Sequence, residues 1–109
     1  MTQTGLEANT RTEGDATVLE LVGEIDGSAR DALHGAYDAG HADGPLILDF
    51  TAVGYINSTG IALIVGVLAR ARAEARAVSA RGLSAHYREI FEITRLSDFM
   101  TIIDSGATA

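Results

Sequence analysis

The sequence predicts one small α/β domain built on a mostly parallel sheet. Apolar, β-branched runs alternate along the chain with segments whose apolar residues recur at helical spacing. The 109 residues suit a single domain over 1–109, and 47% of them are apolar, as in ordinary globular proteins. Because strands that alternate with helices need crossover connections, we expect four to five strands with three to four helices packed on them.

The N-terminal quarter predicts one strand and one turn. Residues 1–12 are polar, so we expect them to be poorly ordered or at most to add an edge strand. Residues 17–22 are apolar and rich in β-branched side chains, which predicts a strand. Gly23 closes this strand, and residues 23–27 predict a turn.

A helix and a buried strand follow. Ser28, with Asp31 three residues later, has the form of a capping box and predicts the start of the helix. We expect four apolar residues at helical spacing to share one face of it, namely Ala29, Leu33, Ala36 and Tyr37. Residues 46–50 form a short, almost continuously apolar run, which is typical of a central strand buried on both faces.

The second predicted helix, over residues 60–75, follows a turn at 51–56 and is apolar on nearly all sides. One stripe is expected to face the sheet, and it comprises Ile61, Ile64 or Val65, Leu68 and Ala71. A second stripe of small residues permits close approach, and it comprises Ala62, Gly66, Ala69 and Ala73. Leu63 and Val67 fall on a third side, which either meets a partner or leans on a neighbouring loop.

The C-terminal third predicts a weak strand at 77–80, a third helix capped by Ser84, and a last strand at 100–103. Apolar residues expected to face inward on the helix or to pack after it are Tyr87, Ile90, Phe91, Leu96 and Phe99. Residues 104–109 are mostly small, and we expect them to be poorly ordered.

Composition excludes several classes of site. The chain has no cysteine, which excludes disulfides, thiol nucleophiles and zinc–thiolate centres. His34, His41 and His86 do not stand at metal-ligand spacing, so we expect no metal. All eight cationic residues are arginines, and the absence of lysine excludes a P-loop.

The charge of the chain argues against polyanionic partners. A formal net charge of −7 disfavours binding to nucleic acid and to anionic membranes. The first nine residues are polar and predict no signal peptide. The longest apolar run, 61–69, is far shorter than the roughly 20 residues of a membrane span. We therefore expect a cytoplasmic protein.

Ser58 is the strongest functional candidate, because it stands between a buried strand and an apolar helix. The N–H groups of a helix's first turn lack intrahelical partners, and the macrodipole places partial positive charge there. A phosphate on Ser58 would therefore meet oriented donors. Asn57, Ser58 and Thr59 are also common capping residue types, so a purely structural role stays open.

No catalytic constellation is recognisable, and we expect neither an enzyme nor a cofactor. Ser58 lacks the first glycine of the GxSxG motif, since position 56 is isoleucine. Glu24 and Asp26 are paired carboxylates, but beside a turn glycine such pairs are more often solvated loop acids.

Three segments, in order and at matching separations, give the chain a family resemblance from about residue 15 to residue 103. They are GEID at 23–26, LILDF through YINSTGI at 46–61, and GLS through IFEITRL at 82–96. With them the chain resembles the STAS-domain anti-sigma factor antagonists of bacteria. This resemblance implies the STAS fold.

The resemblance also implies a phosphorylation switch. The family motif usually reads D-S-[ST]-G-[LIV], which aligns the acceptor serine with Ser58 and leaves Thr59 as second choice. The family aspartate is Asn57 here, which keeps the capping ability and removes a negative charge. That change either lowers the electrostatic cost of phosphorylation or removes a carboxylate that a kinase reads.

The partners implied by the resemblance are a GHKL-type serine kinase that doubles as an anti-sigma factor, and a phosphatase. Binding of the unphosphorylated form would free a sigma factor. Dimerisation of the domain stays open. The expected partner-binding residues are Glu24, Asp26, Asn57, Ser58, Thr59, Gly60, Leu63 and Val67.

Two other functions remain as alternatives. The first is a STAS adaptor or scaffold that is not phosphorylated, such as a stressosome subunit or the small partner of a lipid-transport ATPase. The second is a sensor domain that binds a nucleotide or lipid near the edge of the sheet. A stable large assembly without phosphate would favour the adaptor, and a co-purified ligand would favour the sensor.

Overall fold

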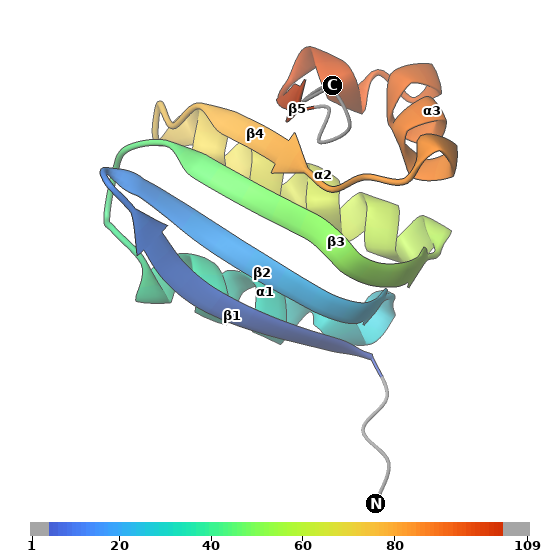
Figure 1. Cartoon of the computed structure of the whole chain (residues 1–109), viewed down its shortest axis with the longest axis horizontal. Coiled ribbons are helices and arrows are strands. Elements are labelled where there is room, and N and C mark those ends of the chain that lie inside the picture. Colours follow the sequence, from blue (N-terminus) through green and yellow to red (C-terminus); the bar gives the residue numbers. More distant parts are fainter. Residues whose placement is uncertain (1–4, 104–109) are drawn as a thin grey trace, which may run out of the picture.

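The computed structural model describes residues 5–103, and within them a mixed sheet has the strand order β1-β2-β3-β4-β5 (Figure 1). β1 runs antiparallel to β2, and the other neighbouring strands pair in parallel. The strands are β1 (Leu6–Glu13), β2 (Ala16–Ile25), β3 (Leu46–Ile56), β4 (Val78–Arg81) and β5 (Thr101–Ile103). The predicted α/β class and mostly parallel sheet are confirmed.

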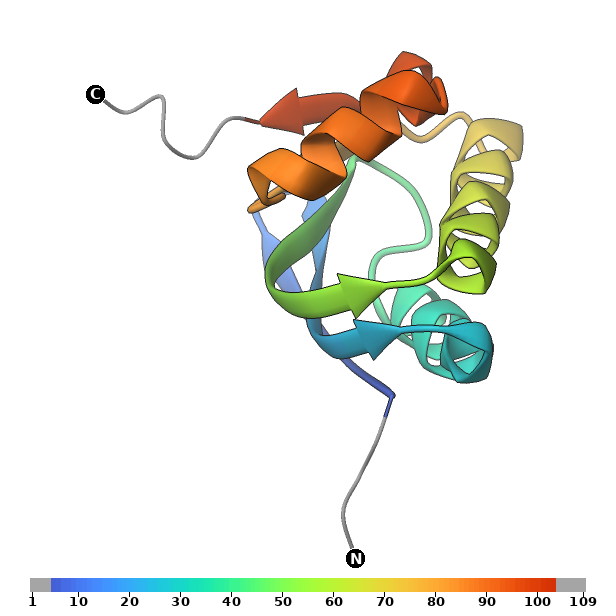
Figure 2. The ribbon, with the colours of Figure 1, turned by 90° about the vertical axis from the view of Figure 1, so that its right-hand side faces the viewer.

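Three α-helices connect the parallel strands: α1 (Arg30–Ala39), α2 (Ser58–Ala73) and α3 (Ala85–Ile93). Figure 2 shows α1 and α2 side by side on one face of the sheet, with α3 apart from them. Right-handed crossovers that advance the same way across a sheet place their helices on the same face, as α1 and α2 are. α3 packs through Phe91, whose ring meets Phe50 of β3 edge-on at 5.7 Å between centroids.

The core lies between the sheet and the first two helices. Strand residues on the covered face alternate with outward-pointing ones, as in β3, where Leu46, Leu48 and Phe50 are buried. Helix α1 contributes the apolar face that its spacing predicts, since Ala29, just before it, and Leu33 are fully buried. Because the covered face is continuous, one core serves the whole domain.

The opposite face of the sheet is coated by charged side chains that pair across four strands. Glu13 accepts from Arg11 at 2.5 Å and from Arg81 at 3.3 Å. Arg11 also reaches Glu20 at 2.6 Å, and Arg81 lies 3.5 Å from Asp49. This alternation of apolar and charged residues leaves one face of the sheet exposed to solvent and buries the other against the helices.

The end of the sheet where β2 and β3 begin is fastened by a buried arginine. Arg76, which is 5% exposed, donates through Nε to the Gly44 carbonyl at 2.8 Å. Its guanidinium lies 4.9 Å from the centre of the Tyr37 ring. The buried Thr17 hydroxyl accepts from the His41 N–H at 2.9 Å. We call these five residues the arginine clamp, because they hold the loop after α1 against the sheet.

Residues 6–12 belong to β1 at the edge of the sheet, so the edge strand is confirmed there as one of the two alternatives predicted for residues 1–12. The strand is polar because only one of its faces is covered, and there Thr10 donates its hydroxyl to the Ala36 carbonyl at 2.7 Å. Residues 1–4 and 104–109, which were also predicted to be poorly ordered, lie outside the described residues.

Two predicted turns are wrong. Residues 23–25 continue β2 and residues 51–56 continue β3, and the two strands stay paired as far as Ile25 and Ile56. Two shifts of register absorb the irregular sequence, so long-range pairing overrides the local turn preference of glycine. Gly23 takes a left-handed φ of 108° within the strand.

The caps and inward-facing residues are mostly as predicted. Ser84 caps α3 by accepting from the Tyr87 N–H, and Leu96 is buried after that helix. Phe99 was expected to pack inward, but it is 51% exposed, because it follows the short 3-10 helix η2 (Leu96–Asp98) at the surface. Ser28 does not cap a helix, since Asp26 caps the 3-10 helix η1 (Gly27–Ala29) in front of α1.

Within residues 5–103, no helix is long and apolar enough to cross a membrane.

Candidate functional site

The candidate site lies where β2 and β3 end and α2 begins. Parallel pairing sets Glu24 beside Tyr55 and Ile25 beside Ile56 at the carboxyl ends of the two strands. The Asn57 N–H then donates to the Ile25 carbonyl at 3.2 Å, which extends the pairing by one residue. Segments about thirty residues apart in sequence therefore meet at this edge, and α2 starts from their junction.

Asn57 fixes the start of α2. Its side-chain oxygen accepts from the Gly60 N–H at 2.8 Å, and its backbone oxygen accepts from the Ile61 N–H at 2.9 Å. Ser58 and Thr59 form the exposed first turn. Among the described residues no group accepts from their N–H groups, which face away from the helix where its dipole is positive.

Gly60 allows the helix to start so close to β2. A Cβ atom at this position would lie 1.9 Å from the Ile25 carbonyl oxygen, so no other residue fits without displacing the backbone. A Cβ on Gly27 would lie 3.3 Å from the Thr59 methyl group, so η1 also touches the first turn of α2. These two glycines place Ser58 at the surface while the chain beneath it is tightly packed.

Asp26 supplies a fixed negative charge beside the first turn. Its carboxylate accepts from the Ser28 hydroxyl at 2.6 Å and from the Ser28 N–H at 2.9 Å. Both hydrogen bonds favour the ionised carboxylate and hold the pKa of Asp26 below its usual value. The Glu24 side chain is exposed near the end of β2.

Tyr87 is a site residue that the sequence analysis did not assign. Its hydroxyl accepts from the Ile56 N–H at 2.9 Å and so braces the end of β3 from α3. Its spacing on α3 indicated only an inward-facing residue, since the hydroxyl's acceptor role depends on where β3 ends. The site therefore rests on four elements: β2, β3, α2 and α3.

The structure brings six of the eight predicted partner-binding residues together. The other two, Leu63 and Val67, lie farther along α2. Glu24, Asp26, Asn57, Ser58 and Thr59 gather at this edge, with Ser58 and Thr59 exposed. Gly60 is buried and supports the surface from below.

The exposed side of α2 differs from the predicted one. Val67 is 1% exposed and belongs to the core, and Leu63 is half-buried against it, so their predicted placement on a partner-facing side is wrong for Val67. The outward residues are instead Ala62, Val65, Gly66 and Ala69. The small-residue stripe faces solvent because α1 and the sheet already cover the bulkier sides.

Charged groups capable of holding a metal do not gather here. Within residues 5–103, no three histidine, aspartate or glutamate side chains come together in a metal-binding arrangement. The chemistry at this edge is that of an exposed hydroxyl, oriented N–H groups and two neighbouring carboxylates.

Comparison with known proteins identifies the fold. The chain resembles the crystal structure of an anti-sigma factor antagonist from Mycobacterium paratuberculosis, with a TM-score of 0.70 and 24% identity over 92% of this chain and 86% of that one. It also resembles unphosphorylated SpoIIAA, with a TM-score of 0.66 and 20% identity over 92% and 88% of the two chains. Phosphorylated SpoIIAA from Bacillus gives a TM-score of 0.62 and 20% identity, covering 93% and 95%.

The sequence itself supports the same assignment. No curated protein matches it. The family described as "Mlab, STAS domain" matches residues 8–103, which include all five strands except the first residues of β1. This match covers most of the chain and agrees with the strand order and helices described above. The chain belongs to the STAS domain family.

Proposed function

We propose that the protein is an anti-sigma factor antagonist whose unphosphorylated form binds an anti-sigma factor serine kinase of the GHKL type. In this role it frees a sigma factor, and phosphorylation of Ser58 ends the interaction until a phosphatase removes the phosphate. The observation that carries the proposal is the exposed Ser58 hydroxyl on a first turn that is packed rigidly through Gly60 and capped by Asn57.

The proposed docking area, which we call the Ser58 surface, comprises the exposed parts of Glu24, Asp26, Ser58, Thr59 and Ala62. Its two carboxylates lie on one side of the first turn of α2. Between Ser58 and Ala69 the helix carries no charged residue. A partner that covers this surface would thus desolvate few charges on α2, which favours association.

Phosphorylation would change the electrostatics of this surface without any change of fold. A phosphate on Ser58 adds roughly −1.5 to −2 charges close to Asp26. Asp26 is ionised at neutral pH, like an ordinary aspartate, and the Ser28 hydrogen bonds lower its pKa further. Burying the added charge against a partner costs several kcal/mol after relaxation. A loss of about 3 kcal/mol reduces affinity more than a hundredfold.

Ser58 is favoured over Thr59 as the acceptor by its surroundings. A Cβ atom on Gly27 would lie 3.3 Å from the Thr59 methyl group, so that side chain lies close to η1. Among the described residues no partner holds the Ser58 hydroxyl. A kinase must withdraw the acceptor hydroxyl into its own active site, and a side chain already packed against a neighbour is harder to withdraw.

Phosphopeptide mass spectrometry on protein isolated from its own cells tests the proposal. Trypsin releases residues 31–70 as one piece, because no lysine or arginine interrupts it. Fragmentation then separates Ser58 from Thr59, Thr51, Tyr55 and Tyr37. We expect a substoichiometric phosphate on Ser58 that changes with growth condition. The Ser58→Ala chain, expressed in the same cells, is the control and should carry none.

A second candidate is a STAS adaptor that is not phosphorylated. Asn57 favours it, since the carboxylate usual beside the acceptor serine is missing. Absence of phosphate under every growth condition, together with recovery of the chain in a stable large assembly, would support this role in place of the switch.

A further inference from the structure

We propose that a groove between α2 and η2 binds a small amphipathic carboxylate. The groove contains an apolar cavity of about 150 Å³, lined by Val65, Leu68, Ala69, Arg72, Leu96 and Phe99. It lies on the C-terminal half of α2, away from the Ser58 surface, and the inference does not depend on the proposed function.

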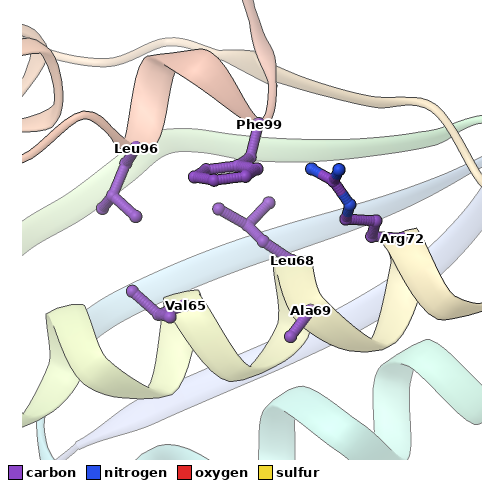
Figure 3. Close-up of a pocket in the computed structure, with 6 residues that line it drawn as sticks. All are labelled: Val65, Leu68, Ala69, Arg72, Leu96 and Phe99. Carbon is purple, nitrogen blue, oxygen red and sulfur yellow. The ribbon is translucent and has the colours of Figure 1, made fainter.

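The cavity has the size and character of a site for one apolar group. Figure 3 shows Leu96 and Phe99 descending from η2 toward Val65 and Leu68 of α2, with the Phe99 ring lying across Leu68. An engineered apolar cavity of about 150 Å³ in another protein stays dry and binds benzene. The apolar cavity between α2 and η2 therefore suits a phenyl ring or a short alkyl chain.

Arg72 supplies a cation at the mouth of this cavity. Its guanidinium carbon lies 5.4 Å from the centre of the Phe99 ring, and Figure 3 shows the group beside the ring edge. Among residues 5–103 no carboxylate lies within salt-bridge distance of Arg72. Guanidinium groups bind carboxylates through two parallel hydrogen bonds, which gives Arg72 a defined ligand chemistry.

The adjoining space leaves room for a polar end of the ligand. A second cavity of about 310 Å³ shares Leu68, Arg72 and Phe99 with the first and continues toward Arg76. Asp98 also lines it, but Arg95 pairs with that carboxylate at 3.0 Å. The electrostatics of the joined groove therefore favour an anion next to Arg72.

Shape favours a small molecule over a partner protein. Leu96 is buried at the floor and Leu68 is almost fully buried, so an occupant must be narrow enough to enter between α2 and η2. Phe99 and Val65, which are 51% and 44% exposed, would lose contact with water when the cavity fills. Pockets of this kind combine an apolar lining with one or a few polar groups that fix orientation.

The test is a titration of the whole chain with 4-phenylbutyrate and, separately, with its neutral amide, followed by ¹H–¹⁵N NMR. We expect saturable shifts at Val65, Ala69, Arg72 and Phe99, and about tenfold tighter binding of the carboxylate. Arg72→Gln should remove that preference and leave amide binding unchanged. Phe99→Ala should weaken both ligands. Arg30→Gln, at an exposed arginine of α1, is the matched control and should change neither.

Three results would overturn the proposal. The first is the absence of saturable shifts up to the solubility limit of the acid. The second is equal binding of acid and amide by the unmodified chain, because Arg72 would then recognise nothing. The third is self-association through this face, seen as shifts at Val65 and Phe99 that depend on protein concentration without ligand and as a dimer in sedimentation.

Discussion

The two ends of the sheet are built in opposite ways. At the end where the strands begin, the arginine clamp joins Arg76, Tyr37 and the loop after α1 through buried hydrogen bonds and a cation–π contact. At the end where β2 and β3 finish, the backbone is packed closely through Gly60, but the Ser58 and Thr59 side chains above it are short and exposed. Side chains of the arginine clamp cover the first end, which we call the closed end. At the second, the open end, a tightly packed backbone carries side chains that are exposed to solvent.

This difference shows how a small domain can combine stability with a surface free for binding. Buried hydrogen bonds such as those of Arg76 Nε and Nη2 rigidify a fold, although Nη1 of the same side chain is buried without a partner. A surface held in place by backbone packing, as at Gly60, keeps hydroxyls and N–H groups free in a fixed geometry. If the two ends divide stability and binding between them, substitutions at each end should have different effects.

The largest effect should come from Gly60→Ala. The added methyl would lie 1.9 Å from the Ile25 carbonyl oxygen, so the start of α2 must move away from β2. We expect a loss of about 3 kcal/mol in the free energy of unfolding. Chemical denaturation measures it. The control is Gly66→Ala on the exposed side of the same helix, where no atom lies within 4 Å and a gain of about 0.5–1 kcal/mol is expected. Equal effects of the two changes would refute the backbone account.

The next effect concerns the closed end. Arg76→Ala removes the donor to Gly44 and the cation above Tyr37, and it leaves a cavity under the loop. We expect a loss of about 2–3 kcal/mol in the free energy of unfolding. Binding at the Ser58 surface should be unchanged under conditions where the variant is folded. A variant that unfolds normally but loses binding would contradict the division of roles.

A smaller effect is expected at the cap of the open end. Asn57→Ala removes the acceptor for the Gly60 N–H and should cost about 1 kcal/mol in thermal or chemical unfolding. Asn57→Asp keeps an acceptor oxygen and should unfold like the unmodified chain. If the alanine variant is as stable as the aspartate variant, the side-chain cap has no energetic role.

The smallest effect is a pH dependence on the charged face of the sheet. Hydrogen bonds from Arg81 and Arg11 hold the pKa of Glu13 below its usual value. A carboxylate with a lowered folded-state pKa stabilises the fold above its unfolded pKa, and that contribution fades as pH falls through the folded value. Melting temperature should therefore drop less between pH 7 and pH 3 in Glu13→Gln than in the unmodified chain. If the melting temperatures of the two chains fall by the same amount between pH 7 and pH 3, the pairing of Glu13 contributes no stability.

The sequence predicts the helices better than the ends of the strands. Helical spacing is local, and it correctly marks the covered face of α1 and the cap at Ser84. The extensions of β2 and β3 depend on each other, because residues 51–56 pair with β2 and with no other strand of the described sheet. A segment that contains Gly54 therefore resembles a turn until its partner strand is known.

In the candidate site, too, the sequence predicts local features and misses the contacts between distant segments. The motif places Asn57, Ser58 and Thr59 at a helix start, which the structure confirms. It does not reveal Tyr87, because the contact with Ile56 joins residues 31 positions apart. It also misjudges Val67, since a helix that is apolar on all sides does not indicate which side the sheet and α1 will cover.

The central claim is that charge on Ser58 controls partner binding at the open end. Its most direct test compares tagged Ser58→Ala, Ser58→Asp and Ser28→Asp chains expressed in the protein's own cells, with quantification of the serine kinase recovered with each. The account predicts full recovery with Ser58→Ala and a loss of more than a hundredfold with Ser58→Asp. Ser28→Asp, which adds the same charge in η1, should fall between them. Equal recovery of the kinase by the two Ser58 variants would contradict the account.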